Sequence, residues 1–386
     1  MTDCKKKKLA IVSTHPIQYN APLFRTMAAS SDMEIRVFYT WSQAMESVKD
    51  KEFGMEIKWD IPLLDGYPYE VVENISRKPK QQFGGLVNPE LIPAIERWGA
   101  DAVLVFGWNF KSHLKVMRYF HGKIPVYFRG DSTLLDDKPG VKTFMRRIAL
   151  RWVYSHVDKA FYVGTNNRDY FLAHGLKPSQ LIFAPHSVEN SRFGTPEVEA
   201  AALKWREELG FSDSDIVIVY AGKLYGVKNI TVLVRQFTDY IAANPSTKLK
   251  LLIVGNGPDE EFVQKNTGRH IALLPFQNQS KIPLIYCIGN VFILPSNSDT
   301  WGLGINEAMA SGRAVVVTNK VGCAVDLVKD GINGFYFDLD SSDNTILFSR
   351  LETTNLQEIG TFNKIAIKQW NYQNISDAIA QTLTRS

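Results

Sequence analysis

Two acidic residues, Asp299 and Glu307, lie on either side of a glycine loop in the stretch SDTWGLGINEAMASG, residues 298–312. Gly302 and Gly304 permit unusual backbone dihedral angles and the close approach of a ligand. Carboxylates accept hydrogen bonds from hydroxyl groups, as an acidic residue does with a ribose in dinucleotide-binding folds. The stretch therefore predicts a site for a ligand that carries hydroxyl groups.

A short helix should follow this loop. The pattern predicts it from Ile305 to Ser311, with Gly312 at its end. The first turn of a helix presents backbone N–H groups and the positive end of the helix dipole, so its N-terminus suits a phosphate. The two acids would repel that phosphate unless they point elsewhere. The alternative is that Asp299 and Glu307 only cap and charge the start of the helix.

Two lysines, Lys223 and Lys228, follow an apolar run that ends at Gly222. Gly222 and Gly226 let the backbone turn tightly on either side of Lys223. Two ammonium groups on one loop suit a diphosphate, whose negative charge is concentrated. A ligand with a diphosphate between two sets of hydroxyl groups is a nucleotide sugar, which these residues suggest without establishing it. The alternative is a pair of solvated lysines.

Polar residues also follow strands predicted in the first half of the chain. His15, Gln18 and Tyr19 form a loop that faces an acceptor or a phosphate, unless it is a structural loop in which His15 bonds to the backbone. A second loop holds Arg129, which suits a phosphate, and Asp131, which suits a sugar hydroxyl or an acceptor. The alternative there is a contact between these two residues.

Trp108 and Asn109 follow another predicted strand. An indole is large and flat, so Trp108 can line one face of an acceptor sugar, or it can pack in the core. The position alone does not decide between the two. Both alternatives are consistent with a loop at the carboxyl end of a strand, where ligands of parallel sheets bind.

The strands that must position these residues are short, continuous apolar runs. Such runs predict parallel strands covered on both faces, and their alternation with helical intervals predicts an α/β chain of doubly wound sheets. The runs lie at residues 9–14, 34–39, 102–106, 124–128, 160–164 and 181–185, and then at 216–222, 249–255, 271–275, 291–296 and 314–318. They are too many for one compact sheet. We therefore predict two domains with a break within residues 186–201, where the chain is polar and holds Gly and Pro, ahead of a helix at 203–209.

Composition excludes several classes of protein. The chain has 386 residues, 45% of them hydrophobic, and a net charge of only +4, which is too weak to argue for a nucleic-acid partner. The three cysteines, Cys4, Cys287 and Cys323, are far apart and have no metal-type spacing. The apolar run after the N-terminal lysines is too short for a signal peptide, and no run is long enough to span a membrane. We therefore expect a cytoplasmic protein.

One segment could contact a membrane. Residues 142–156, KTFMRRIALRWVYSH, are basic and aromatic and should form a helix. Such a helix can lie on anionic lipid. It can equally be an ordinary surface helix whose apolar face packs into the core, which is the reading that the pattern alone favours.

Taken together, the two lysines and the run from YCIGNVFILPSNSDTWGLGINEAMASG to VKDGINGFYF resemble the family 4 glycosyltransferases, whose signature is two glutamates separated by seven residues. The resemblance covers residues 216–337 well and the rest of the chain weakly. It implies that Glu307 holds the ribose hydroxyls of a donor and that Lys228 contacts its phosphates. It also implies that Asp299 lies beside the transferred sugar. The backbone amides of Trp301, Gly302, Leu303 and Gly304 would meet the phosphate and sugar.

The same resemblance implies a GT-B fold, in which two Rossmann-like domains face each other across a cleft. The first would be an acceptor-binding domain at residues 1–190, to which a C-terminal helix at about 370–386 returns. The second would bind a nucleotide-sugar donor with residues 191–369. The family transfers its sugar with retention of configuration and needs no metal or other cofactor. The partners would be that donor and a glycan or lipid-linked acceptor. Peripheral contact with the inner face of an anionic membrane depends on the basic segment 142–156.

Two residues depart from the family pattern. Asp299 stands where the first glutamate is usual and is one methylene shorter, and Lys223 stands where arginine is more common. Lysine is a point charge without the planar fork of arginine, so this exchange is not neutral at a diphosphate. The sequence thus predicts a retaining glycosyltransferase, in cell-surface polysaccharide or glycoconjugate synthesis. A nucleotide-sugar epimerase of the same fold and a non-catalytic nucleotide-sugar-binding protein are the alternatives.

Overall fold

The computed structural model describes residues 6–45, 48–50 and 55–385. Cys4 lies outside these residues. The chain divides into two compact units, and each is described by itself. The first unit contains Met1–Val48, Pro62–His186 and Tyr372–Ser386, and the second contains Lys49–Ile61 and Ser187–Asn371. The segment 49–61, which the sequence placed with the first half, thus belongs to the second unit.

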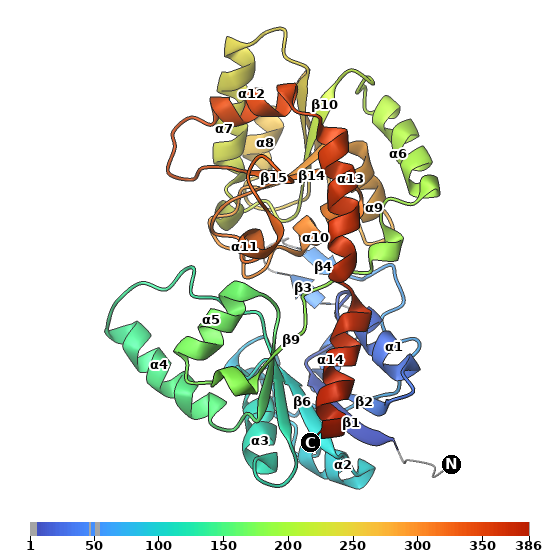
Figure 1. Cartoon of the computed structure of the whole chain (residues 1–386), viewed down its shortest axis with the longest axis vertical. Coiled ribbons are helices and arrows are strands. Elements are labelled where there is room, and N and C mark those ends of the chain that lie inside the picture. Colours follow the sequence, from blue (N-terminus) through green and yellow to red (C-terminus); the bar gives the residue numbers. More distant parts are fainter. Residues whose placement is uncertain (1–5, 46–47, 51–54, 386) are drawn as a thin grey trace. The chain divides into compact units, whose positions relative to one another are not determined.

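The first unit is built on a seven-stranded sheet with the order β5-β2-β1-β6-β7-β8-β9, in which all described pairs are parallel (Figure 1). Its strands are β1 (Lys7–Ser13), β2 (Met33–Tyr39), β5 (Tyr69–Val71), β6 (Ala102–Phe106), β7 (Val126–Arg129), β8 (Lys159–Tyr162) and β9 (Leu181–Phe183). Its helices are α1 (Ala21–Ala29), α2 (Leu91–Trp98), α3 (Lys111–Phe120), α4 (Val141–Tyr154), α5 (Thr165–Ala173) and α14 (Tyr372–Arg385). Two apolar clusters cover the central strands, because β1 and β6 send alternate side chains into each of them.

The last helix of the chain, α14, is part of the first unit. It packs beside α1 and β1, and Figure 1 shows the helix labelled α14 next to α1. Ile375 and Ile379 are buried in the same cluster as β1, and Lys7 Nζ donates a hydrogen bond to the carbonyl of Leu383 at 3.0 Å. The C-terminal segment therefore completes the hydrophobic core of a domain that begins more than three hundred residues earlier.

The second unit has a six-stranded parallel sheet with the order β12-β11-β10-β13-β14-β15. Its strands are β10 (Ile216–Ala221), β11 (Leu249–Val254), β12 (Ile271–Leu274), β13 (Val291–Leu294), β14 (Ala314–Val317) and β15 (Gly334–Tyr336). Its helices are α6 (Pro196–Glu208), α7 (Ile230–Ala243), α8 (Glu260–Lys265), α9 (Ile282–Ile288), α10 (Leu303–Ala310), α11 (Ala324–Leu327), α12 (Thr345–Thr353) and α13 (Leu356–Ala366). In chain order this is the 3-2-1-4-5-6 arrangement of dinucleotide-binding sheets, whose ligands bind where the order reverses, here between β10 and β13.

Every strand predicted from the sequence is present, with ends shifted by a few residues at most. The sequence missed β5 and β15, and also β3 (Val48–Asp50) and β4 (Met55–Ile57), which form a two-stranded sheet. Each of these has only three residues, too few to make an apolar run. No helix in the part of the chain that the structure describes is long and apolar enough to cross a membrane.

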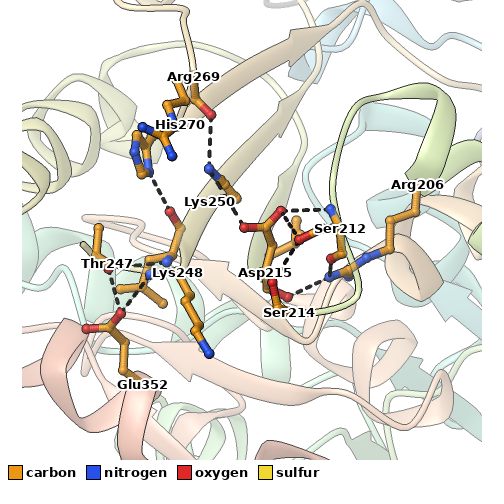
Figure 2. Close-up of polar contacts among 12 residues, drawn as sticks. Arg206, Ser212, Ser214, Asp215, Thr247, Lys248, Lys250, Arg269, His270 and Glu352 are labelled. Atoms are coloured by element: carbon orange, nitrogen blue, oxygen red, sulfur yellow. Dashed lines mark hydrogen bonds and ion pairs between the residues drawn. The ribbon is translucent and has the colours of Figure 1, made fainter. Parts of the chain in front are cut away.

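Charged residues also gather at the opposite, amino edge of the second sheet, and Figure 2 shows that they bond to one another and to the backbone. The buried guanidinium of Arg206 donates hydrogen bonds to the carbonyls of Ser212, Asp215 and Ile288. Asp215 accepts from the Ser212 amide at 2.7 Å and lies 3.8 Å from Lys250 Nζ. These contacts hold the turn that leads into β10, so we assign this cluster to stability.

We expect Asp215→Asn to lower the free energy of unfolding at pH 7 by about 1–2 kcal/mol, because an amide loses the charge-assisted bonds. Burial alone would raise the pKa of Asp215, but the hydrogen bonds from Ser212 and the charges of Lys250 and Arg206 outweigh it and lower the pKa below 3.8. The stabilisation is therefore complete above that value and is lost as the pH falls through the lower, folded-state pKa. Thermal melts of both forms between neutral pH and pH 3 measure this.

Asp213→Asn is the matched control, because Asp213 is exposed in the same turn. The control should melt like the parent chain at every pH. A melting temperature for Asp215→Asn equal to that of the control at pH 7 would contradict the assignment of this cluster to stability.

Candidate functional site

The residues predicted to bind a donor lie beyond the carboxyl ends of β10 and β13, at the reversal point of the second sheet. Lys228 ends a 3₁₀ turn, Gly226–Lys228, that follows β10. Asn229 then takes a left-handed backbone conformation, with φ of 59°, and α7 begins at the next residue. Asp299 follows β13. Adjacent strands thus deliver a cation and an anion to one edge of the sheet.

Lys228 and Asp299 form an ion pair, with 2.6 Å between Nζ and Oδ2. The two side chains are only 17% and 19% exposed, so the charges attract each other more strongly than a surface pair would. The alternative that Lys228 is a solvated lysine is therefore wrong. A phosphate that enters here meets a lysine already held in place and an acid that competes for it.

The backbone around Asp299 is held against the segment that follows β14. The Asp299 amide donates to the Lys320 carbonyl at 3.1 Å, and the Gly322 amide donates to the Asp299 carbonyl at 2.9 Å. The Cys323 amide donates to the Trp301 carbonyl at 2.9 Å. The Trp301 amide, which the sequence predicted to face a phosphate, donates to Asp299 Oδ1 at 3.2 Å.

Gly302 supplies the turn between this loop and α10. Its φ is 88°, in the left-handed region, and a Cβ there would lie 2.5 Å from Val321 Cγ1. A side chain is therefore excluded twice, by conformation and by space. The first turn of α10 begins with Leu303 and Gly304, whose amides precede the hydrogen-bonded ladder of the helix. Figure 1 labels α10 within the second unit.

The acids do not cap α10, so that alternative is wrong. The N-terminal cap is Gly302, and the first turn holds no acidic residue. Glu307 lies in the second turn and is 4% exposed. It accepts a hydrogen bond from the hydroxyl of Tyr286, on α9, with 2.7 Å between the oxygens. Burial of a carboxylate costs free energy, because the charge loses its contact with water. Hydrogen-bond partners such as Tyr286 have to offset this cost.

Trp301 is buried and fixed from two sides. Its indole Nε1 donates to Asn306 Oδ1 at 2.9 Å, within α10. Its ring stacks at a tilt against Trp370, with 5.3 Å between ring centroids. Asn190 donates to the carbonyl of Trp370 at 3.0 Å. This hydrogen bond joins the beginning and the end of the segment Ser187–Asn371. These contacts fix the geometry of the loop.

Lys223 is half-buried, and its backbone is held by Tyr220, whose hydroxyl donates to the Lys223 carbonyl at 2.8 Å. Gly222, which precedes it, has an extended backbone with φ of 158°, and a Cβ there would lie 3.0 Å from the Tyr220 hydroxyl oxygen. Burial and the nearby charge of Asp299 raise the pKa of Tyr220 well above its usual value. Tyr220 thus stays a neutral hydrogen-bond donor at the base of the site.

The acceptor candidates belong to the first unit. His15 is 9% exposed, and its Nδ1 lies 2.9 Å from Thr14 Oγ1, so its partner is a side chain and not the backbone. Its ring meets Trp41 edge-on, and burial lowers its pKa to about 4. His15 is therefore neutral at physiological pH. Gln18 and Tyr19 are half-buried in the turn that leads to α1.

Arg129 has a structural use. It is 5% exposed and donates to the carbonyls of Ala184 and Pro185, at 2.9 and 3.0 Å. Burial lowers its pKa to about 10, against the opposing charge of Asp131, so it remains cationic at neutral pH. Asp131 is half-buried next to it. Trp108 is partly buried against the core of the first unit, which favours the packing alternative.

Sequence reasoning missed Tyr286, Asn306 and Trp370. Tyr286 and Asn306 lie within the stretch that carried the family resemblance, but nothing in their spacing showed that they bond to Glu307 and Trp301. Trp370 is far away in the chain from the loop that it packs against. These contacts depend on the fold, which is why spacing alone could not supply them.

Comparisons with known proteins agree with the geometry. The family model described as "Glycosyl transferases group 1" matches residues 201–346. A D-inositol 3-phosphate glycosyltransferase of Rhodococcus opacus is 25% identical over 205 residues, which cover 50% of this chain and 45% of the relative. An alpha-monoglucosyldiacylglycerol synthase of Acholeplasma laidlawii is 28% identical over 145 residues, 36% of this chain and 35% of the relative. The matches thus span less than half the length of these curated relatives.

A solved structure matches over nearly the whole chain. HepE of Anabaena in complex with UDP and glucose aligns with a TM-score of 0.71 and 18% identity, covering 98% of this chain and all of the other. At that identity the likeness shows the fold, which is α/β with two Rossmann-like sheets of the GT-B type. The family match lies within the unit that holds Lys228, Asp299 and Glu307, so residues 201–346 are similar to the group 1 glycosyltransferases.

Proposed function

We propose that the protein transfers a sugar, with retention of configuration, from a nucleotide diphosphate sugar to a glycan or lipid-linked acceptor. The observation that carries the proposal is the Lys228–Asp299 ion pair at the reversal point of the second sheet, one strand-end loop away from the buried carboxylate of Glu307. A cation for a diphosphate and an acid for ribose hydroxyls are what a nucleotide sugar requires.

In this proposal the bond between the anomeric carbon and the diphosphate breaks as the acceptor oxygen bonds to that carbon. The acceptor proton passes to the departing phosphate oxygen. Lys228 and the first-turn amides of α10 would stabilise the charge that develops on the diphosphate. The fold holds Lys228 and these amides beyond the ends of β10 and β13. We propose that no metal takes part.

The ion pair also suggests a role for Asp299. The Asp299 carboxylate accepts a hydrogen bond from Lys228 Nζ, and a diphosphate that takes this lysine displaces it. Once displaced, Asp299 can accept a hydrogen bond from a sugar hydroxyl. We propose that Asp299 is a counter-ion that the donor exchanges for its own phosphate, and that the exchange couples diphosphate binding to sugar recognition.

Asp299→Asn separates these two roles. We expect the variant to bind a nucleoside diphosphate without sugar as tightly as the parent chain or a few-fold more tightly, because an amide competes less for Lys228. Turnover of the sugar donor should fall by roughly tenfold or more, as expected for a lost charged hydrogen bond. Calorimetry with the diphosphate and initial rates with its sugar give the two values. Equal weakening of both would contradict the exchange.

The donor itself is tested by thermal shift against nucleoside diphosphates and their sugars, because a ligand that binds the folded state raises the melting temperature. UDP and UDP-glucose are the first probes, since the structural neighbour from Anabaena is described with UDP and glucose. Incubation of the best donor with glycans and glycolipids then measures nucleotide release. Release that requires an acceptor supports the proposal. An epimer formed from donor alone, or binding without turnover, would replace it with one of the two alternatives.

We further propose a cytoplasmic protein that acts in cell-surface polysaccharide or glycoconjugate synthesis and contacts the inner face of an anionic membrane. One relative is named for monoglucosyldiacylglycerol synthesis, which supports a lipid among the acceptors to be tried. Fractionation of cells with and without high-salt washing tests the location. Recovery entirely in the soluble fraction at low salt would count against membrane contact.

A further inference from the structure

Helix α4 exposes a continuous apolar stripe. Its large apolar residues between 49% and 80% exposed are Val141, Phe144, Met145, Ile148 and Trp152. At about 100° per residue these positions fall within an arc of roughly 100°, so they form one face of the helix. An ordinary surface helix would turn such a face inward. The sequence-based preference for a helix with this face in the core is therefore wrong.

The core contact of α4 is made by a different face. Leu150, Val153 and Tyr154 are buried in the cluster of the first unit. On the helical wheel these residues lie opposite the exposed stripe, at roughly 120–180° from its centre. The helix is thus anchored through its C-terminal turns, and the stripe is not needed to hold it in place.

Basic residues border the stripe on both sides. Lys142 lies on one side of the stripe, and Arg147 and Arg151 lie on the other, while Arg146 lies further round the helix. From Lys138 to His156 the sequence contains five lysine or arginine residues and no acidic residue. Arg146 is paired with Asp137 in the preceding loop. An apolar face flanked by cations is the pattern of a helix that lies in a membrane interface.

Trp152 lies at the C-terminal end of the stripe, and a further cation lies beside its ring. The guanidinium of Arg118, on α3, is 5.4 Å from the centre of its ring. Tryptophan favours the headgroup region of a bilayer, because its ring is apolar and its N–H is polar. Arginine beside it can bond to lipid phosphates. The apolar and charged groups thus suit the same layer of a bilayer.

We infer that α4 is a membrane-binding helix, which inserts Phe144, Met145 and Ile148 among the acyl chains of an anionic bilayer while its basic borders meet the headgroups. A second copy of this chain is a poorer occupant. Two such helices face to face would bring their basic borders together without acids to offset them, and like charges at an interface are repelled. Negative lipid headgroups satisfy the same borders.

The inference deepens the proposed function, on which its biological meaning rests. The loop from β7 to α4 leaves the carboxyl edge of the first sheet, where His15, Trp108 and Asp131 also lie. The N-terminal turns of α4, with Val141 and Phe144, therefore begin at the edge that we propose for the acceptor. A helix embedded there would bring a lipid-linked acceptor to the acceptor edge without its leaving the membrane.

The test is flotation of the full-length chain with vesicles of phosphatidylcholine alone, or with roughly 30 mol% phosphatidylglycerol, a fraction typical of an anionic surface. We expect binding to the anionic vesicles that weakens as salt rises. Phe144→Ser with Ile148→Ser should reduce the partition coefficient by at least roughly tenfold, because two apolar side chains no longer leave water. Lys142→Glu with Arg147→Glu should reduce it by a similar factor on anionic vesicles only.

The matched control is Phe362→Ser with Ile365→Ser, which removes the same two side-chain types from an exposed position on α13. The control should float like the parent chain. Failure of the parent chain to float, an unchanged Phe144/Ile148 variant, or a dimer in light scattering that this variant abolishes would overturn the inference. A thermal-shift measurement with the best nucleoside diphosphate is made on the same samples. Donor binding needs no vesicle, so a chain that binds the diphosphate but does not float contradicts the membrane inference and leaves the proposed function intact.

Discussion

Lys228→Ala should lower the turnover number for sugar transfer by roughly 100- to 1,000-fold, the size of loss seen when one charge-stabilising group is removed from an active site. The ammonium is held at 2.6 Å from Asp299 and is largely shielded from water, so its charge is only weakly screened. Its removal takes a cation from the leaving diphosphate. It also leaves the Asp299 carboxylate, still held by the Trp301 amide, without its cation, and this carboxylate then repels the phosphates.

Initial rates at saturating donor and acceptor measure this effect, and calorimetry with the nucleoside diphosphate shows how much of it is ground-state binding. Lys265→Ala is the matched control, because Lys265 is an exposed lysine on α8 in the same unit. It should leave both values unchanged. Turnover in Lys228→Ala within a factor of about two of the control would remove Lys228 from the chemistry, since such a factor corresponds to only about 0.4 kcal/mol.

The sequence predicted the fold because the strands are buried on both faces. Ile11, Leu104, Val219 and Ile293 belong to runs with no polar alternation, and such runs can be read without knowing their neighbours. The edge strands β5 and β15 could not be predicted. Their pairing depends on the strand beside them rather than on their own residues.

Those site residues that directly follow a strand could be predicted from the sequence. Lys228 and Asp299 each follow a strand, and the parallel sheet brings the ends of neighbouring strands together. The contacts of Glu307 were not predictable, because Tyr286 reaches it from another helix. The burial of Arg129 could not be predicted either, because the two carbonyls that it bonds to come from a distant segment of the chain.

The orientation of α4 shows a further limit. Its sequence contains two apolar faces, and periodicity cannot say which of them meets the core. The structure decides, because Leu150 and Val153 are buried while Phe144 and Ile148 are exposed. An apolar pattern therefore predicts a helix more reliably than it predicts what the helix packs against.

Glu307→Gln should raise the KM for the donor by roughly 10- to 100-fold and change the turnover number much less, the loss expected when a hydrogen bond to a charged group is removed. Glu307 is buried, and the Tyr286 hydroxyl fixes one of its oxygens. We propose that the ribose hydroxyls of the donor donate to this carboxylate. A glutamine offers one acceptor oxygen and an N–H₂ group that cannot accept, so at least one hydroxyl loses its partner. The ribose is distant from the breaking bond, and such contacts stabilise ground and transition states alike.

The ligand itself provides the sharpest readout. The parent chain should bind the ribonucleoside diphosphate more tightly than its 2′-deoxy form, and Glu307→Gln should bind the two with nearly equal affinity. Glu261→Gln, on the exposed side of α8, is the matched control and should keep the preference. Tyr286 can donate to the glutamine oxygen as it does to the carboxylate, so the variant should still fold, which its melting temperature would show. A preference for ribose that survives in Glu307→Gln would contradict the ribose assignment. In Lys228→Ala the same preference should remain intact, because the lysine acts on the phosphates and the acid on the sugar of the nucleoside.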